Sequence, residues 1–354
     1  MSLARVALGA GFGVIVSMGA LAGCRSDGGD GSGAGAGSST SSSPGAGGGD
    51  GGSTGDGGST GEGGGAIVGC EGPEQTVQQI TTGAVGPGVK VSVNGVVAMS
   101  QKWLVSKSST GSCLWGVFVS APGLTTTGPN TGLLALSYGT PAKVPEGGNT
   151  AFCPVLGVEP AGDKIPDNVK PGDVLDLVGV TAVFPNPPNC SAPNPDNQVG
   201  MLQLGQVCKA ELKGTAAVPT PAVLSGADAA KLASTTDKAF HDQWGAVKVR
   251  LENVAHDSTQ AAVVGDFGVI KLANGVEVGN KVSYRGYLAS SNICHASLDY
   301  DTQAPGMTFT RIDGFHYLNF CSWGLQINDK CADMAPRSED CTADVCEPTT
   351  LPGG

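Results

Sequence analysis

The chain has 354 residues, among them 57 glycines and 11 cysteines, and a formal net charge of −11. From Ala66 onward, 18 Lys and Arg stand against 26 Asp and Glu, a net charge of −8. A protein that binds phosphate backbones non-specifically is expected to carry a basic stripe, so this balance counts against that class of function.

The first residues have the parts of a secretory signal peptide. Arg5 supplies one positive charge, residues 6–21 carry no charge, and the small residues Ala22 and Gly23 follow. This uncharged stretch is shorter than the roughly 20 residues that a membrane-spanning helix needs. The pattern therefore predicts a signal peptide over residues 1–23.

The segment Leu21-Ala22-Gly23-Cys24 resembles the lipobox of bacterial lipoproteins. The resemblance implies cleavage before Cys24 and diacylglycerol on its thiol, so that the membrane is a partner through this lipid. Several acyl chains, at about 0.8 kcal/mol per buried CH₂, hold firmly to a bilayer. Because Arg25 rather than aspartate follows, the resemblance implies an extracytoplasmic protein of the outer membrane that can be exposed at the cell surface. The alternative is an ordinary signal peptide with a chance cysteine.

The segment after the lipidation site is of low complexity. Apart from Pro44, residues 27–65 contain no apolar side chain larger than alanine, so they bury too little surface to offset chain entropy. We therefore expect residues 24–65 to be a lipidated cysteine followed by a disordered tether, about 35 Å in root-mean-square span. The repeat "GDGGST" resembles calcium-binding β-roll repeats but lacks their large apolar residues, which favours a spacer.

The remaining sequence reads as two related β-rich units. Short Val-rich segments end in Gly, Pro or Asn, as strands and turns do. Four segments recur in order: 89–97 with 247–255, 115–120 with 266–272, 169–180 with 276–287, and 199–207 with 305–313. A short helix is expected before each set, at 74–83 and 225–234, and Ser225 with Asp228 fits a capping box.

Three short motifs resemble the oligonucleotide/oligosaccharide-binding (OB) fold of secreted bacterial proteins. They are Gly95-Val96-Val97, Trp115–Val119 and Gly172–Gly179, and Asn253-Val254-Ala255 replaces the first motif in the second unit. The resemblance implies an all-β chain of two tandem OB-like five-stranded Greek-key barrels, each with a short preceding helix and stapled by disulfides. The domains would span 66–218 and 219–346, with a disordered tail at 347–354. Another β-sandwich with duplicated hairpins is the alternative.

Ten cysteines remain after Cys24, an even number in an oxidising compartment, which predicts disulfides. Their places in the repeat predict the pairs Cys190–Cys208 and Cys294–Cys321, and Cys113 and Cys153 flank a long loop that they would close. The pairing of Cys70, Cys331, Cys341 and Cys346 stays open. We expect Cys70 to pair with one of the other three.

Catalytic and metal-binding patterns are sparse. No G-x-S-x-G follows the tether and no C-x-x-C occurs, so we expect no catalytic residue, no metal site and no cofactor. The histidines are scattered without ligand spacing: His241, His256, His295 and His316. Asp299 and Asp301 alternate as calcium ligands can, although solvated loop acids are the simpler interpretation.

OB folds bind bases or sugars by stacking them on aromatic side chains of the second and third strands. The resemblance makes Trp115, Tyr284 and Tyr287 the candidate ligand-binding residues, with packing inside a barrel as the alternative. We therefore expect a membrane-anchored, non-catalytic binding protein for a surface protein or a glycan, and for nucleic acid only by fold analogy. A structural envelope lipoprotein without a small ligand is the alternative function.

Overall fold

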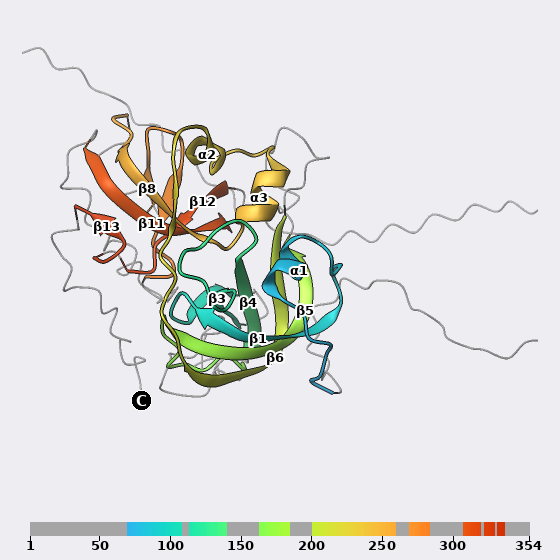
Figure 1. The fold of residues 1–354 in the computed structure, drawn as a ribbon. Coiled ribbons are helices and arrows are strands. Elements are labelled where there is room, and N and C mark those ends of the chain that lie inside the picture. The colour runs from blue at the N-terminus through green and yellow to red at the C-terminus, as the bar shows by residue number, and fades with distance from the viewer. Residues whose placement is uncertain are drawn as a thin grey trace, which may run out of the picture. The chain divides into compact units, whose positions relative to one another are not determined.

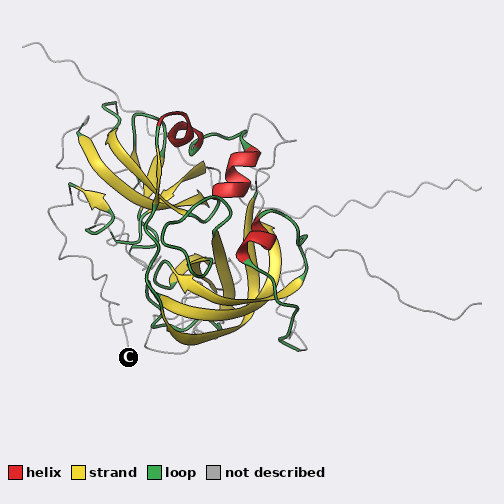
Figure 2. Cartoon of the chain, in the orientation of Figure 1, coloured by secondary structure: helices red, strands yellow, loops and turns green. Residues whose placement is uncertain are grey.

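The structure is a computed structural model that describes residues 69–107, 113–139, 163–184, 200–259, 269–283, 307–319, 322–329 and 331–336. These residues belong to one compact unit between Gly64 and Gly354, and they form two β-sheets with three short helices (Figures 1 and 2). No helix among the described residues is long and apolar enough to cross a membrane. The predicted signal peptide, the tether and Cys24 lie outside the described residues.

The first sheet has six strands in the order β1-β5-β6-β4-β3-β2. Their bounds are β1 Lys90–Ala98, β2 Trp103–Lys107, β3 Cys113–Ser120, β4 Gly132–Gly139, β5 Asp173–Phe184 and β6 Met201–Thr215. β4 and β6 pair in parallel, and the other neighbours pair antiparallel. β1 also meets β3, through the pairs Val97↔Ser120 and Ala98↔Val119. The helix α1 (Val77–Thr81) precedes this sheet.

The second sheet follows in the order β7-β8-β11-β12-β10-β9, with β13 paired to β11. Its elements are β7 Ala222–Leu224, α2 Gly226–Lys231, α3 Lys238–Trp244, β8 Lys248–Ala255, β9 Ile270–Lys271, β10 Glu277–Gly279, β11 Thr308–Asn319, β12 Ser322–Gln326 and β13 Met334–Ala335. β10 and β12 pair in parallel, and an isolated antiparallel bridge joins His256 to Leu272 beside β8 and β9.

The two sheets share one pairing scheme. β1, β3, β4, β5 and β6 have the same neighbours and directions as β8, β9, β10, β11 and β12. Gly95 in β1 and Asn253 in β8 both have a positive φ, 68° and 51°, so asparagine occupies the left-handed position that glycine fills in the first copy. The sequence match between the first strands therefore aligns structurally equivalent residues.

The expected match between the later segments is wrong. Segment 276–287 contains β10, which pairs with β9 and β12 and so corresponds to β4, not to β5. β11 pairs antiparallel with β8 as β5 does with β1, so segment 305–313 corresponds to β5 rather than β6. Segments 169–180 and 276–287 are both rich in valine and contain Gly-Asp or Gly-Asn, so they look alike in sequence. Only the strands with which they pair distinguish them.

The predicted mostly-β chain is confirmed, but two closed five-stranded barrels are not. The first sheet carries a sixth strand, and β1 contacts β3 through only two residue pairs. In the second sheet, the described link between the equivalent strands is a single bridge. β7 extends that sheet beside β8 by parallel pairing.

Both expected helices form, but the capping box belongs to α1 and not to α2. Thr76 caps α1: its side chain accepts the Gln79 amide N–H, and the Gln79 side chain accepts the N–H of Thr76. Ser225 precedes α2 but makes no capping hydrogen bond with its side chain. The box predicted at Ser225 is therefore wrong.

The disulfide pairing of Cys208 differs from the expectation. Cys70 and Cys208 are bonded, with Cα atoms 5.9 Å apart, so the predicted pair Cys190–Cys208 is wrong, as is pairing of Cys70 with a C-terminal cysteine. The segment after Cys70 runs along β1 through the bridge Glu74↔Ser92, which places Cys70 near β6 despite 138 residues of separation. Cys113 and Cys331 are also disulfide-bonded. Cys153, Cys190, Cys294 and Cys321 lie outside the described residues.

Replacing Cys70 and Cys208 together with serine should lower the free energy of unfolding by about 2–5 kcal/mol, because this bond closes a long loop in the unfolded chain. Urea denaturation of both proteins measures the difference. Peptide mapping of the non-reduced chain should recover a Cys70–Cys208 peptide, and recovery of Cys208 joined to Cys190 would contradict the structure.

Candidate functional site

The two sheets meet through a stack of aromatic rings. Side chains alternate along β3, so Val117 and Val119 enter the core of the first sheet while Phe118 points to its other side. There the Phe118 ring lies parallel to that of Phe315 from β11, with centroids 4.2 Å apart. Tyr317 packs edge-on against Phe118 at 5.9 Å. This stack joins the two sheets through parallel, closely packed rings.

The stack covers the outer face of the two strands to which the OB resemblance assigned ligand binding. Leu134 and Leu136 of β4 belong to the same buried cluster as Phe118, and each is at most 3% exposed. The second sheet contributes Leu318 and Trp323 to that cluster. The outer face of β3 and β4 therefore packs against protein and is closed to a ligand.

Trp115 is fully buried, so its predicted role as a stacking residue is wrong. Its ring lies over the ammonium group of Lys102, with Nζ 5.1 Å from the ring centroid. A small sheet fills its interior with large side chains, and this tryptophan is one of them. Tyr284 and Tyr287 lie outside the described residues, and their predicted role stays a prediction.

A groove of about 580 Å³ opens between α1, α3 and the adjoining ends of β5 and β6. Its polar lining includes Thr82, Asn130 and Gln243, and Val183 and Leu202 supply apolar surface. No aromatic ring stands among the described residues that line it. We take this groove as the candidate functional site, because it is larger than the pocket of about 430 Å³ between α2 and β8.

Hydrogen bonds fix the two walls of the groove to each other. The Thr81 hydroxyl of α1 donates to the carbonyl oxygen of Asn130 at 3.2 Å. The N–H of Asn130, which has φ 62°, donates to the carbonyl oxygen of Gln243 in α3 at 2.6 Å. Lys238 and Asp242 pair with each other along α3, so the groove's lysine is neutralised within its own wall.

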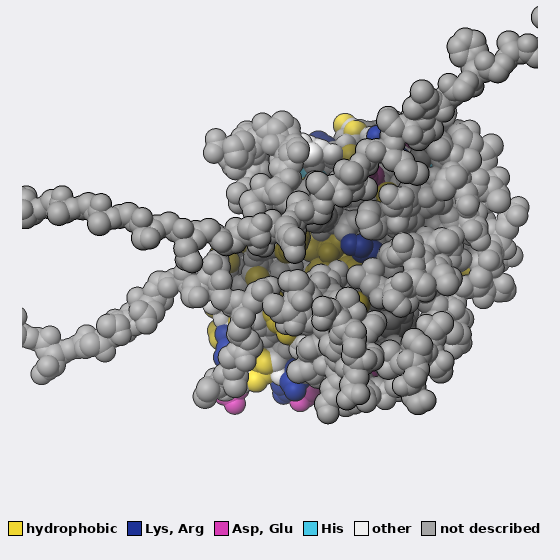
Figure 3. All heavy atoms as spheres, turned by 180° about the vertical axis from the view of Figure 1, so that it is seen from behind, with side chains coloured by type: hydrophobic (Ala, Val, Ile, Leu, Met, Phe, Trp, Pro, Cys, Tyr) yellow, Lys and Arg dark blue, Asp and Glu magenta, His cyan; other side chains and the backbone are white. Residues whose placement is uncertain are grey.

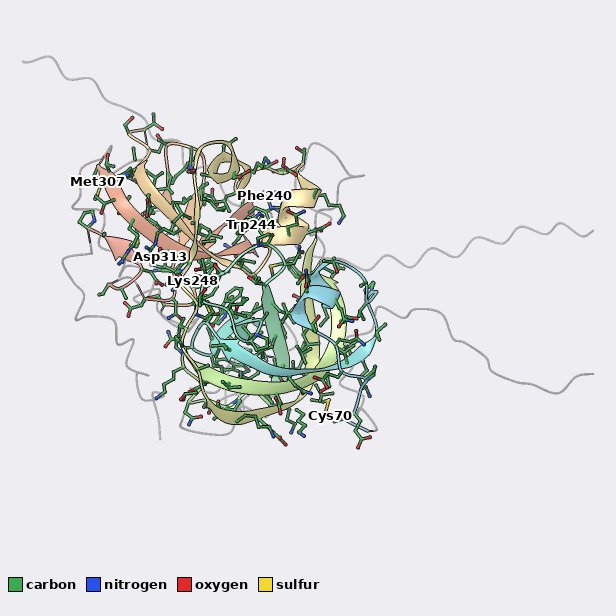
Figure 4. The ribbon with its side chains drawn as sticks, viewed as in Figure 1. Cys70, Phe240, Trp244, Lys248, Met307 and Asp313 are labelled. Atoms are coloured by element: carbon green, nitrogen blue, oxygen red, sulfur yellow. A yellow bond between two sulfur atoms is a disulfide. The ribbon has the colours of Figure 1, made fainter. Side chains whose placement is uncertain are left out.

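The other side of α3 is locked onto the second sheet by two histidines. His241 Nδ1 lies 2.7 Å from Nε2 of His316 in β11, and His241 Nε2 lies 2.7 Å from the Ser234 carbonyl oxygen. The Trp323 ring stacks on both imidazoles, with centroid distances of 4.2 and 4.6 Å. Phe240 and Trp244 also lie on the side of α3 that faces this sheet (Figure 4).

Burial keeps both imidazoles neutral. Desolvation lowers the pKa of His241 to about 4 and lowers that of His316 well below its ordinary value. His241 therefore donates from Nε2–H to Ser234, and its Nδ1 accepts the Nε2–H of His316. Because 75 residues separate the two, no local spacing in the sequence predicted that they meet.

Charge and metal ligands add no second site. The described residues contain no cluster of three His, Cys, Asp or Glu that could hold a metal ion. On the face seen in Figure 3, the visible described Lys, Arg, Asp and Glu side chains are interspersed. Asp299 and Asp301, the candidate calcium ligands, lie outside the described residues.

Comparison with known proteins adds no functional assignment. Protein-family models, curated proteins and solved structures all give no match to this chain. Any function is therefore argued from the groove and from the sequence features that precede the folded part.

Replacing Phe118 or Phe315 with alanine should each lower the free energy of unfolding by about 3–5 kcal/mol, because each substitution opens a cavity between the sheets. The double variant should show a coupling of about 0.5–1.5 kcal/mol for the stacked pair. Val223→Ala, at a side chain that is 54% exposed, is the control and should change stability little. Strict additivity of the two phenylalanine substitutions would contradict the stack.

Stability should fall as the pH drops from about 6.5 to about 4. In the unfolded chain histidines bind protons below about pH 6.5, whereas His241 in the folded chain stays neutral down to its pKa of about 4. Acid therefore lowers the free energy of unfolding by about 3 kcal/mol through His241. Denaturation measured at several pH values should show this slope, reduced in His241→Gln. The destabilised variant Phe118→Ala keeps both histidines and should retain the slope. An unchanged slope in His241→Gln would contradict the buried pair.

Proposed function

We propose that the chain is a membrane-anchored, extracytoplasmic lipoprotein whose folded part is a non-catalytic binding protein for a surface protein partner. The lipobox ending at Cys24 and the glycine-rich tether support the anchor and the location in the outer membrane. The disulfide Cys70–Cys208 is in keeping with an oxidising compartment.

We also propose that each sheet is OB-like. The order β1-β5-β6-β4-β3, in which β4 and β6 form the one parallel pair, supports this relation for the first sheet. The order β8-β11-β12-β10-β9, with its parallel pair β10–β12, supports it for the second. In this scheme, duplication of one unit produced both sheets, and their contact replaced an exposed binding face.

The observation that carries the proposed binding role is the open groove between α1 and α3 beside a covered β3–β4 face. Thr82 and Gln243 present exposed polar side chains next to the apolar Val183 and Leu202, a mixture that suits a peptide chain. Sugars and bases are bound largely by stacking on aromatic rings, and the described residues of the groove include none. A protein partner is thus favoured over a glycan.

Nucleic acid is disfavoured by charge. The groove's cation, Lys238, is paired with Asp242, and the sequence from Ala66 onward has a net charge of −8. Phosphate binding requires unpaired cations to replace released counterions.

The second candidate is a structural envelope lipoprotein without a small ligand. The burial of the β3–β4 face favours it, because the surface that an OB-like sheet would offer to a ligand stabilises the protein instead. The two candidates differ in which surface meets a partner in the cell: the groove, or exposed strands such as β6 and β7.

A photo-crosslinking amino acid placed at Thr82 or Gln243 should capture one defined protein in intact cells of the source organism. Matched positions at Leu212 and Val223, exposed on β6 and β7, should capture it weakly or not at all. Mass spectrometry identifies the captured chain. Equal capture from all four positions would favour the structural alternative and contradict the groove.

The same substituted chains carrying Cys24→Ser test the anchor. Loss of the lipidation site should release the protein from the membrane fraction and abolish the crosslink from the groove. A Cys24→Ser chain that stays in the membrane fraction would contradict lipidation at this cysteine.

A further inference from the structure

Lys102 is a fully buried lysine that lies between two carboxyl groups. Its Nζ is 2.7 Å from Oδ1 of Asp163 and 2.6 Å from Oδ1 of Asp167. The third contact is the Ile165 carbonyl oxygen, at 2.8 Å. The side chains of Lys102 and Asp163 are 0% and 2% exposed, and the Trp115 ring covers the ammonium group. An amine and a carboxyl group are thus held together away from water.

Asp163 is the carboxyl group that can hold a proton beside Lys102. Its side chain is 2% exposed, against 30% for Asp167, and an ionised carboxylate is costly to bury. Burial raises the pKa of Asp163, which favours its protonated form. The charge that balances Lys102 then lies on Asp167, whose side chain is 30% exposed.

We propose that Lys102 and Asp163 join in an intramolecular isopeptide bond, with Asp167 transferring the protons. The Asp167 carboxylate takes one proton from the ammonium group, and the free amine attacks Cγ of Asp163. The Nζ–Cγ bond forms and the Cγ–OH bond breaks. Asp167 relays the second amine proton to the leaving hydroxyl, which departs as water. The products are one amide, one water and a protonated Asp167, so the step is a condensation without oxidant or cofactor.

The backbone of Ile165 prepares both partners for this step. Its N–H donates to Oδ2 of Asp163 at 3.0 Å, which stabilises the negative charge that develops on this oxygen during the attack. Its carbonyl oxygen accepts from Nζ and so fixes the amine on the other side. Fixed reacting groups replace a bimolecular encounter by an intramolecular one.

A second lysine of the chain, with a side chain that is 12% exposed, provides an internal comparison. Lys248 Nζ lies 2.6 Å from Oδ1 of Asp333, but no second carboxyl group contacts this Nζ among the described residues. Oδ2 of Asp333 accepts the N–H groups of Asn328 and Asp329. Because no second carboxylate is placed to take a proton from Lys248, this pair stays an ion pair, and the structure assigns one isopeptide bond to the described part of the chain.

The bond would close the chain between residues 102 and 163, a segment that contains β2, β3 and β4. In the order of the first sheet these strands follow β6, which carries Cys208. Unlike a disulfide, this link survives reduction, so the first sheet would stay cross-linked in a reducing environment.

The exported chain, purified, reduced and denatured, tests the proposal by mass spectrometry. After trypsin digestion we expect a branched peptide that joins residues 91–107 to residues 144–164, lighter than the sum of the two by one water molecule. Recovery of residues 91–102, 103–107 and 144–164 as separate peptides at full mass would overturn the proposal, because trypsin cleaves after an unmodified Lys102. So would a linear peptide 144–164 that has lost water, because that is a succinimide at Asp163.

Two variants separate the proton transfer from the fold. Asp167→Asn retains a hydrogen-bonding side chain but no carboxylate, and should yield unlinked peptides. Asp333→Asn makes the same change at the comparison pair and should leave the branched peptide at its original yield. A branched peptide from Asp167→Asn in unchanged yield would overturn the role of Asp167. The mass of the unsubstituted chain tests the bond itself, whether or not either variant folds.

Discussion

The stacked rings of Phe118 and Phe315 are the contact on which the rest of the folded part depends. Each ring comes from the side of its strand that faces away from that strand's own sheet core, so neither sheet could keep its ring dry alone. Bringing the rings together buries the outer face of β3 and β4 and sets two β-units of the same pairing scheme against each other. The contact thus joins stability to function, because it removes the face on which an OB-like unit would stack a ligand.

With that face covered, the candidate groove lies where elements of both units meet. α3 presents one side to the groove and the other to the second sheet, where neutral His241 and His316 pair beneath Trp323. The 128–131 turn ties the same helix to α1, because the Asn130 N–H donates to the Gln243 carbonyl oxygen and the Asn130 carbonyl oxygen accepts from the Thr81 hydroxyl. The groove is therefore held by buried contacts on each side, as a binding site on a rigid scaffold requires.

The sequence predicted the β-rich class and the match between the first strands, 89–97 with 247–255, because valine-rich strands ended by turn residues are local patterns. It failed where strands are distinguished by partners: segment 276–287 corresponds to β4 because β10 pairs in parallel with β12. It also failed for Cys208, since Cys70 reaches it only after the N-terminal segment has aligned with β1. The buried group around Lys102 left no signal, because Asp163 lies 61 residues away.

By itself, the sequence determined the resemblance to a lipidated, tethered and exported chain, since the N-terminal charge, the length of the apolar stretch and the low complexity of the tether are local properties. It also determined that the folded part is built from strands. Only the tertiary structure decided that Trp115 covers a buried lysine instead of a ligand, that two distant histidines lie within hydrogen-bonding distance of each other, and that Phe118 is interior. The physical reason is that a side chain becomes buried only when a second surface of the protein covers it. Alternation along β3 marks which side chains share a face, but the protein that covers that face comes from more than 190 residues further along the chain.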